Sequence, residues 1–290
     1  FSDWSSSSFR KGVTFSIPDS KLIHIDIDPQ TIGRTYPVDV GIVADLKQAL
    51  FDLHGGISKK EGKDAWDARA PWLGVIAARK KAWRATLARR VSATGMPASM
   101  LAVLQRLRQA LPPDAVTTVG SGHCQAAVRQ GFQCLEPHTH ITSGGYSSMG
   151  FAVPAAMASA IVRPGIPVVA IVGDGDFLMS AHELATCAMH GLPVIILVLN
   201  NSGHISIRDG QNAIFQRNVA SEFPEIAGSC DSYSPDFAAL ARSFQIEVAV
   251  RANSLEEIEP AIKRAIASQG PALIEVPITR DPALAGAEGA

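Results

Sequence analysis

An acid and an amide that could hold a metal ion stand at the ends of two apolar segments. Asp174 lies in a Gly-Asp-Gly triplet, and Asn201 is the second residue of an Asn-Asn pair 27 positions later. Mg²⁺ prefers oxygen ligands and readily shares its shell with phosphate oxygens. The pair therefore suits a divalent metal that holds a diphosphate. The triplet alone is a weak signal, because many ordinary turns contain it.

The sequence between these residues predicts how they are brought together. Residues 167–172 and 193–199 are short runs rich in Val, Ile and Leu, which is typical of buried strands. Residues 180–190 between them favour a helix. Strand, helix and strand in this order form a right-handed crossover between parallel strands. Both strands then end at the same edge of the sheet, where we expect Asp174 and Asn201 to meet.

A tight turn is expected directly after the first of these strands. Gly175 has no Cβ, so it lets the backbone approach a phosphate closely. Successive N–H groups in such a turn form a nest that binds anions. The turn is therefore a candidate diphosphate site.

Composition limits the classes of protein. Of 290 residues, 47% are hydrophobic, and the formal net charge is −1. This favours a sizeable core and does not favour nucleic acid or a membrane surface as partner. No apolar stretch reaches the roughly 18 residues of a transmembrane helix. The four cysteines lack Cys-x-x-Cys spacing, which favours free thiols in the cytoplasm over a zinc site.

Strands and helices alternate along the rest of the chain, which predicts an α/β fold with a doubly wound parallel sheet flanked by helices. Further strands are expected at residues 22–27, 115–119, 140–142, 247–250 and 272–276. Further helices are expected at residues 45–53, 70–90, 100–111, 235–244 and 255–268. The polar stretch after Asn201, residues 202–223, is predicted to be a mobile loop, and residues 204–222 are expected to line the substrate entrance.

The run from the Gly-Asp-Gly triplet to Asn-Asn resembles the thiamine-diphosphate motif. The chain as a whole resembles the acetolactate synthase and pyruvate oxidase group of thiamine-diphosphate enzymes. Segments 21–33, 95–100, 143–156 and 271–277 carry the rest of the resemblance. It implies three parts: residues 1–55 as the end of a partial α/β central domain, 56–94 as a linker with a helix, and 95–290 as the diphosphate-binding domain.

The resemblance also implies roles for single residues. Asp174, Asn201 and the carbonyl of Gly203 match the ligands of Mg²⁺. Met149 matches a bulky apolar residue beneath the cofactor that imposes its bent shape; the alternative is ordinary core packing. The complete set of implied cofactor contacts is Ser121, Gly122, Ser147, Met149, Asp174, Gly175, Asp176, Asn201, Gly203 and His204. Two alternatives stay open: His204 could simply be solvated, and His123 could act in place of Ser121.

A nucleotide site is implied near the start of the chain. In many relatives the central domain binds the adenosine part of FAD or ADP. Asp26 with Ile27, and Asp45 with Leu46, fall where those contacts occur, and acids at strand ends can bind ribose hydroxyls. The alternative is that both acids merely cap turns.

The activating group of the cofactor is expected elsewhere. In the family, a Glu on a pyrimidine-binding domain activates the cofactor, and the chain shows no counterpart of that domain, so its catalytic residue is unknown. Because the chain opens at Phe1 within what resembles the central domain, we expect a fragment, a cleaved product or one chain of a split enzyme. The implied partners are a chain or segment that supplies the missing domain, within a homodimer or tetramer.

The implied function is thiamine-diphosphate-dependent cleavage or ligation of a C–C bond next to a carbonyl. The first hypothesis is an acetolactate-synthase-like carboligase, a lyase or transferase with a 2-oxo acid donor. The alternatives are a lyase, decarboxylase or C–C hydrolase acting on a dione, sulfoacetaldehyde or a 2-hydroxyacyl-CoA, a flavin redox enzyme, or a non-catalytic cofactor-binding subunit. Arg208 either clamps a substrate carboxylate or is a surface charge.

Overall fold

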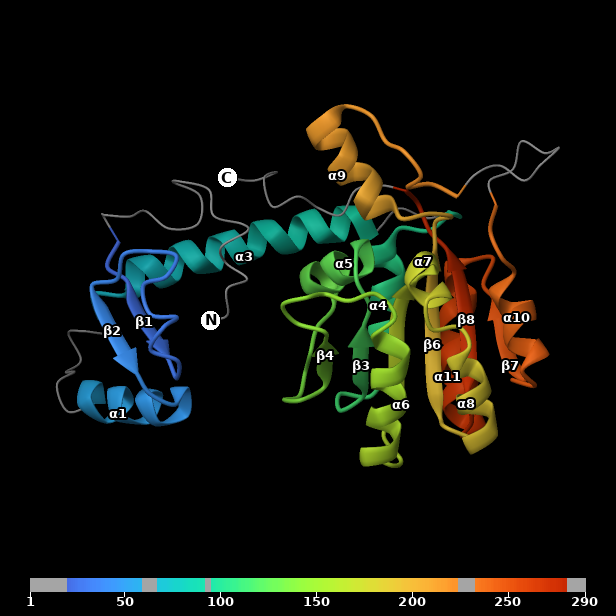
Figure 1. The fold of residues 1–290 in the computed structure, drawn as a ribbon, viewed down its shortest axis with the longest axis horizontal. Helices are drawn as coiled ribbons and strands as arrows, with labels where there is room; N and C mark the ends of the chain where they lie inside the picture. Colours follow the sequence, from blue (N-terminus) through green and yellow to red (C-terminus); the bar gives the residue numbers. More distant parts are fainter. Residues whose placement is uncertain (1–19, 59–66, 92–94, 224–232, 281–290) are drawn as a thin grey trace. The chain divides into compact units, whose positions relative to one another are not determined.

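The computed structural model (Figure 1) describes residues 20–58, 67–91, 95–223 and 233–280. The chain divides into two compact units, residues 1–82 and residues 83–290. Among the described residues, no helix is long and apolar enough to cross a membrane.

The first unit contains a short parallel strand pair. β1 (Ile23–Asp26) pairs with β2 (Val40–Val43), and α1 (Leu46–Ser58) follows. Asp26 is opposite Val43, so Asp26 and Asp45 lie near the same ends of the two strands. Helix α1 runs beyond its predicted end through residues 55–58, which the sequence assigned to a polar boundary. Residues 59–66 of that boundary lie outside the described part of the chain. The helix predicted at residues 70–90 is confirmed as α3 (Ala70–Val91).

The second unit is built on a six-stranded parallel sheet with the order β4-β3-β5-β6-β8-β7. The strands are β3 (Val116–Val119), β4 (His140–Thr142), β5 (Val168–Gly173), β6 (Val194–Asn200), β7 (Val248–Arg251) and β8 (Ala272–Pro277). β5 and β6 pair in parallel, with Gly173 opposite Leu199. The crossover expected from the two apolar runs is therefore confirmed.

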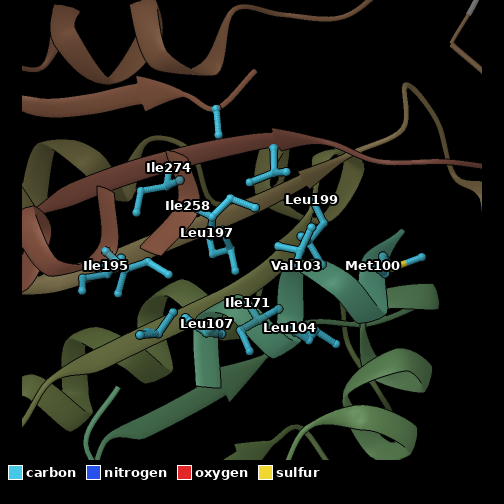
Figure 2. Packing of buried hydrophobic residues seen from close by; sticks show 14 of the residues in the cluster. Met100, Val103, Leu104, Leu107, Ile171, Ile195, Leu197, Leu199, Ile258 and Ile274 are labelled. Atoms are coloured by element: carbon cyan, nitrogen blue, oxygen red, sulfur yellow. The ribbon is translucent and has the colours of Figure 1, made fainter. Parts of the chain in front are cut away.

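Helices cover both faces of this sheet, which confirms the doubly wound α/β fold. The core on one face includes residues of α4 (Met100–Ala110), α5 (His123–Gly131) and α11 (Ile258–Ser268), which follows a 3₁₀ turn (Leu255–Glu257). The other face holds α6 (Ala152–Val162), α8 (Glu183–His190) and α10 (Phe237–Ser243); α6 and α8 lie toward the viewer in Figure 1. Figure 2 shows Val103, Leu104 and Leu107 of α4 packed among Ile171, Leu197 and Leu199 of the strands.

Two helices at the carboxyl edge of the sheet differ from the prediction. The Gly-Asp-Gly triplet was expected to form a turn, but α7 (Asp174–Leu178) begins at its Asp. Phe177 is fully buried in the core, and this anchors the chain in a helical conformation. The loop expected over residues 202–223 contains α9 (Ile205–Phe215), which begins at the buried Ile205. Helices α5 and α6 were also not predicted.

The strand order places the site. β4 and β5 flank β3 on opposite sides, so the direction of the strand order reverses at β3. In open α/β sheets, ligands bind outside the carboxyl ends of the strands at such a reversal. The segments that follow β3, β5 and β6 are the ones that carry most of the predicted cofactor contacts.

Candidate functional site

A cavity of about 90 Å³ lies at the carboxyl edge of the sheet. Most of the predicted cofactor contacts line it: Ser121, Gly122, Met149, Asp174, Gly175, Asp176, Asn201, Gly203 and His204. They come from segments that follow β3, β4, β5 and β6. Met149 is half-buried and lines the cavity. Lining residues that the sequence did not indicate include Met100 and Cys124, and Ser206 comes from the segment expected to line the substrate entrance.

Asp174 holds the end of β6 against the start of α7. Its side chain is buried, with 2% of the residue exposed. Oδ1 accepts the N–H of Gly175 at 2.7 Å, and Oδ2 accepts the N–H groups of Asn201 and Gly203 at 3.2 and 3.1 Å. Burial raises the pKa of this carboxyl group, and the backbone hydrogen bonds act in the opposite direction. The N–H of Gly175, predicted to face a diphosphate, is engaged by Asp174.

The loop from Asn201 to Gly203 is held through its backbone groups, and the side chain of Asn201 is left available to bind a ligand. The carbonyl oxygens of Asn201 and Ser202 accept hydrogen bonds from the Arg280 guanidinium at 2.8 and 3.2 Å. The side-chain amide of Asn201 lines the cavity and has no hydrogen-bond partner among the described residues. Gly203 has φ +159°, and a Cβ there would lie 3.0 Å from the Ser221 carbonyl oxygen.

His204 packs directly over the start of α7. A Cβ on Gly175 would lie 2.4 Å from the His204 ring, so the absence of a side chain at Gly175 makes room for the imidazole. The ring also meets Phe223 edge-on, with centroids 5.6 Å apart. His204 is therefore packed beside the cavity and is not simply solvated.

Ser147 is not among the residues that line the cavity, but it contacts one of them. Its hydroxyl donates to Gln125 Oε1 at 3.0 Å and lies 3.2 Å from the Ser121 hydroxyl. It has φ +50°, in the left-handed region. These contacts join the turn before Met149 to α5 and to the end of β3.

Asp26 and Asp45, the two acids predicted to contact a nucleotide, are both used in local caps. Asp26 Oδ1 accepts the N–H of Asp28 at 2.9 Å. Asp45 Oδ1 accepts the N–H groups of Lys47 and Gln48 at the start of α1, at 3.0 and 3.2 Å. These contacts match the capping alternative. Ile27 and Leu46, the neighbouring predicted residues, are exposed.

Arg208 forms hydrogen bonds with acceptors within the protein. Its guanidinium donates to Asp209 Oδ1 at 2.9 and 2.8 Å and to the Arg280 carbonyl at 2.8 Å. A weaker contact reaches Glu222 at 3.4 Å. These contacts use four of its five N–H donors, so a substrate carboxylate bound at two points would have to displace one of them.

His123 joins α5 to α9 beside the cavity. Its Nε2 lies 3.2 Å from Asp209 Oδ2, and its Nδ1 is buried without a hydrogen-bond partner among the described residues. Burial lowers the pKa of this imidazole, against the opposing effect of Asp209. The sequence offered His123 as an alternative to Ser121, and both line the cavity.

A buried polar cluster that the sequence did not indicate supports the loop after β6. Asn200 Nδ2 donates to Glu275 Oε1 at 2.8 Å and to Ser234 Oγ at 2.7 Å, while its Oδ1 accepts the N–H of Ser202 at 3.1 Å. Glu275 is fully buried and pairs with Arg251 at 3.1 Å. Its position within an apolar strand was the only signal in the sequence.

Glu275 should make stability depend on pH. Burial is the largest cause that raises the pKa of Glu275 above its ordinary 4.5. The folded state therefore keeps the Glu275 proton to higher pH than the unfolded chain does. The stabilisation that this proton gives the folded state is complete below pH 4.5 and is lost as pH rises through the raised pKa of Glu275. Glu275→Gln removes the titrating group. We therefore expect the difference in free energy of unfolding, wild type minus Glu275→Gln, to decrease as pH rises through this window. Urea unfolding at several pH values measures it; a difference that stays constant with pH would contradict the assignment.

Two family sequence patterns match the chain. The pattern described as "Thiamine pyrophosphate enzyme, C-terminal TPP binding domain" matches residues 120–276, and that of the "Thiamine pyrophosphate enzyme, central domain" matches residues 1–53. The first match spans all of the predicted metal and cofactor contacts. The second spans the four residues predicted to contact a nucleotide.

Acetolactate synthases are among the similar proteins. Three are acetolactate synthase 1, chloroplastic, of Oryza sativa subsp. japonica (32% identity), the acetolactate synthase large subunit of Corynebacterium glutamicum (33%) and a probable acetolactate synthase large subunit of Methanocaldococcus jannaschii (32%). The alignments cover 89%, 86% and 93% of this chain and 39%, 38% and 44% of those proteins, so the chain spans about two-fifths of their length. With one family pattern matching more than half of its residues, the chain belongs to the thiamine pyrophosphate enzymes.

Proposed function

We propose that this chain carries the diphosphate-binding part of the active site of an acetolactate-synthase-like carboligase that uses a 2-oxo acid donor. In this proposal Asp174, Asn201 and the Gly203 carbonyl hold Mg²⁺. One observation carries it: the Asp174 carboxylate is buried at the carboxyl edge of the sheet, receives hydrogen bonds from backbone N–H groups, and lies in the same cavity as the unpartnered amide of Asn201.

These residues fit a divalent cation. A carboxylate has about four lone-pair positions, and the three backbone hydrogen bonds to Asp174 leave one of them on Oδ1. Among the described residues no cationic side chain pairs with Asp174, so a bound cation would supply the missing positive charge. Carboxylate, amide and carbonyl oxygens are the ligands that Mg²⁺ takes. The described residues contain no cluster of three His, Cys, Asp or Glu of the kind that a transition metal would use.

The remaining predicted contacts have complementary tasks in this proposal. Bound thiamine diphosphate supplies an electron sink for making or breaking a bond next to a carbonyl. Ser121, Gly122, His204 and the backbone N–H groups of Gly175 and Asp176 bind its diphosphate, and the Gly175 N–H would exchange its hydrogen bond with Asp174 for one with the diphosphate. Met149 supports the rings, and the Ser147 carbonyl and Met149 N–H contact the pyrimidine edge.

The size of the cavity supports a shared site. At about 90 Å³ it is well below the roughly 300–1,000 Å³ of sites that enclose a ligand. Ile207, which lines the cavity, is 55% exposed, and two apolar side chains on segments that contribute to its lining are also exposed, Tyr146 by 97% and Met179 by 54%. We propose that a pyrimidine-binding domain of another chain or segment covers this rim and supplies the activating Glu, within a homodimer or tetramer.

Three finer assignments belong to the proposal. The division into residues 1–55, 56–94 and 95–290 is retained, with the first part as the end of a central domain. FAD or ADP would bind beside Asp26 and Asp45, and bound FAD would make the preparation yellow. The unpaired Cys124, Cys134 and Cys187 fit a cytoplasmic location.

Product analysis tests the function. The 290-residue chain with thiamine diphosphate, Mg²⁺ and pyruvate should give no turnover, because the activating Glu comes from its complement. The enzyme isolated with all of its subunits should join two 2-oxo acid units with release of CO₂. Turnover by the chain alone would overturn the shared site. CO₂ release without a new C–C bond would favour a decarboxylase or lyase, and an isolated enzyme that binds the cofactor without consuming any 2-oxo acid would favour a non-catalytic subunit.

A further inference from the structure

The Asp176 carboxylate joins three segments that are far apart in the sequence. Its Oδ2 accepts the N–H of Ser121 at 2.5 Å, across 55 residues. Its Oδ1 accepts the N–H of Gly150 at 2.6 Å, across 26 residues. Asp176 is itself the third residue of α7. The end of β3, the turn after Met149 and the start of α7 therefore converge on one side chain.

The space around Asp176 is closely fitted to it. A Cβ on Gly120 would lie 1.9 Å from Asp176 Oδ2 and 2.8 Å from its Cγ. The carboxylate thus occupies the volume that a side chain at position 120 would need. Gly150 has φ +78°, a conformation that suits glycine, and its missing side chain leaves room for Met179 at 3.3 Å. Both segments are shaped to approach α7 closely.

The two acids of α7 accept hydrogen bonds from backbone N–H groups of different segments. Asp174 accepts the N–H groups of Asn201 and Gly203 after β6, and Asp176 accepts those of Ser121 and Gly150. Only 2% of Asp176 is exposed, and a buried carboxylate is costly unless such donors satisfy it. Each of its oxygens already receives one short hydrogen bond. Its side chain is therefore committed to the protein backbone.

We propose that the Asp176 carboxylate is a positioning residue that fixes the Ser121 and Met149–Gly150 segments to α7 and so shapes the cofactor site. This role differs from that of its backbone N–H group, which the proposed function assigns to the diphosphate. The inference rests on the proposed function for its effect on the cofactor. Its structural part, the two hydrogen bonds, can be tested without any cofactor.

Hydrogen exchange of the cofactor-free chain tests the structural part. Asp176→Ala should accelerate exchange of the Ser121 and Gly150 amide protons about tenfold or more, because both lose a buried acceptor. Asp176→Asn should accelerate at least one of them, because an amide offers one acceptor oxygen to two N–H donors. Glu183→Ala removes a carboxylate on α8 whose ion pair is with the exposed His182, and should leave both rates unchanged. Unchanged rates in both Asp176 variants would overturn the proposal.

A double-mutant cycle tests the fit between Gly120 and Asp176. Gly120→Ala should accelerate exchange at Ser121 and Gly150 in the wild-type background, because its Cβ displaces the carboxylate. In the Asp176→Ala background the same change should have little further effect. Equal effects of Gly120→Ala in the two backgrounds would contradict the proposed contact. Far-UV circular dichroism confirms that each variant is folded.

Cofactor binding tests the second half of the inference. Titration with thiamine diphosphate and Mg²⁺ should give an affinity at least about tenfold weaker for Asp176→Ala than for Glu183→Ala. Equal affinities, together with faster amide exchange, would show that the hydrogen bonds do not shape the site and would overturn that part. If the wild type binds no cofactor, the proposed function fails, while the exchange rates still decide whether Asp176 positions the two segments.

Discussion

Asp174→Asn will weaken metal-dependent binding of thiamine diphosphate by at least about 100-fold. Loss of a group that only supports a metal ligand costs 10–100-fold in metal affinity, and Asp174 is proposed as a ligand itself. The substitution removes the charge and places an amide N–H₂ where one carboxylate oxygen accepted backbone N–H groups. A calorimetric titration with the cofactor in the presence of Mg²⁺ measures the affinity of each variant.

Glu183→Gln is the matched control for Asp174→Asn. Glu183 begins α8, nine residues after Asp174, and its carboxylate pairs with the exposed His182. The Glu183→Gln variant should bind the cofactor with the affinity of the wild type. Binding by Asp174→Asn within threefold of this control would contradict the metal assignment.

Phe177→Ala will lower the free energy of unfolding of the second unit by about 3–5 kcal/mol, the usual cost of emptying an aromatic site in a core. Phe177 is fully buried and meets Phe237 of α10 edge-on, with ring centroids 5.5 Å apart. Urea unfolding followed by circular dichroism measures the loss. Because Phe177 follows Asp176 directly, α7 should also shift, and cofactor affinity should fall.

Two control variants show whether the loss in Phe177→Ala comes from emptying the core. Phe177→Leu keeps an apolar side chain in the core and should cost less than about 1.5 kcal/mol. Phe215→Ala changes a side chain that is 66% exposed and should stay within about 0.5 kcal/mol of the wild type. A loss below about 1 kcal/mol for Phe177→Ala would show that α7 is not anchored through this ring.

The strands of the sheet could be predicted because their signal is local. Every residue of β6 is buried, and its run of Val, Ile and Leu is visible without knowledge of the fold. Helix α7 has five residues, too few to show a helical period. Helix α9 contains Asp209, Gly210 and Asn212, which have low helix propensity. It is stabilised by contacts with distant residues: Arg208 bonds to Arg280, and Asp209 lies beside His123.

From residue type and spacing alone, the site was predictable only where the side chain carries the chemistry, whereas Gly122 and Gly203 were implied by the family resemblance. Asp174 and Asn201 could be placed at one edge because strand ends meet there, and both line the cavity. The contacts of Asp176 with Ser121 and Gly150 use backbone N–H groups, which every residue but proline has, so residue type gives no signal. The Asn200–Glu275 contact spans 75 residues and appears only when β6 and β8 pair.

The most direct test of the central claim is a titration of the wild-type chain with thiamine diphosphate, once with Mg²⁺ and once with a chelator in its place. The metal site built on Asp174 predicts saturable binding that requires the cation and is lost on chelation. Equal binding under both conditions, or no binding at millimolar cofactor with Mg²⁺ present, would contradict it.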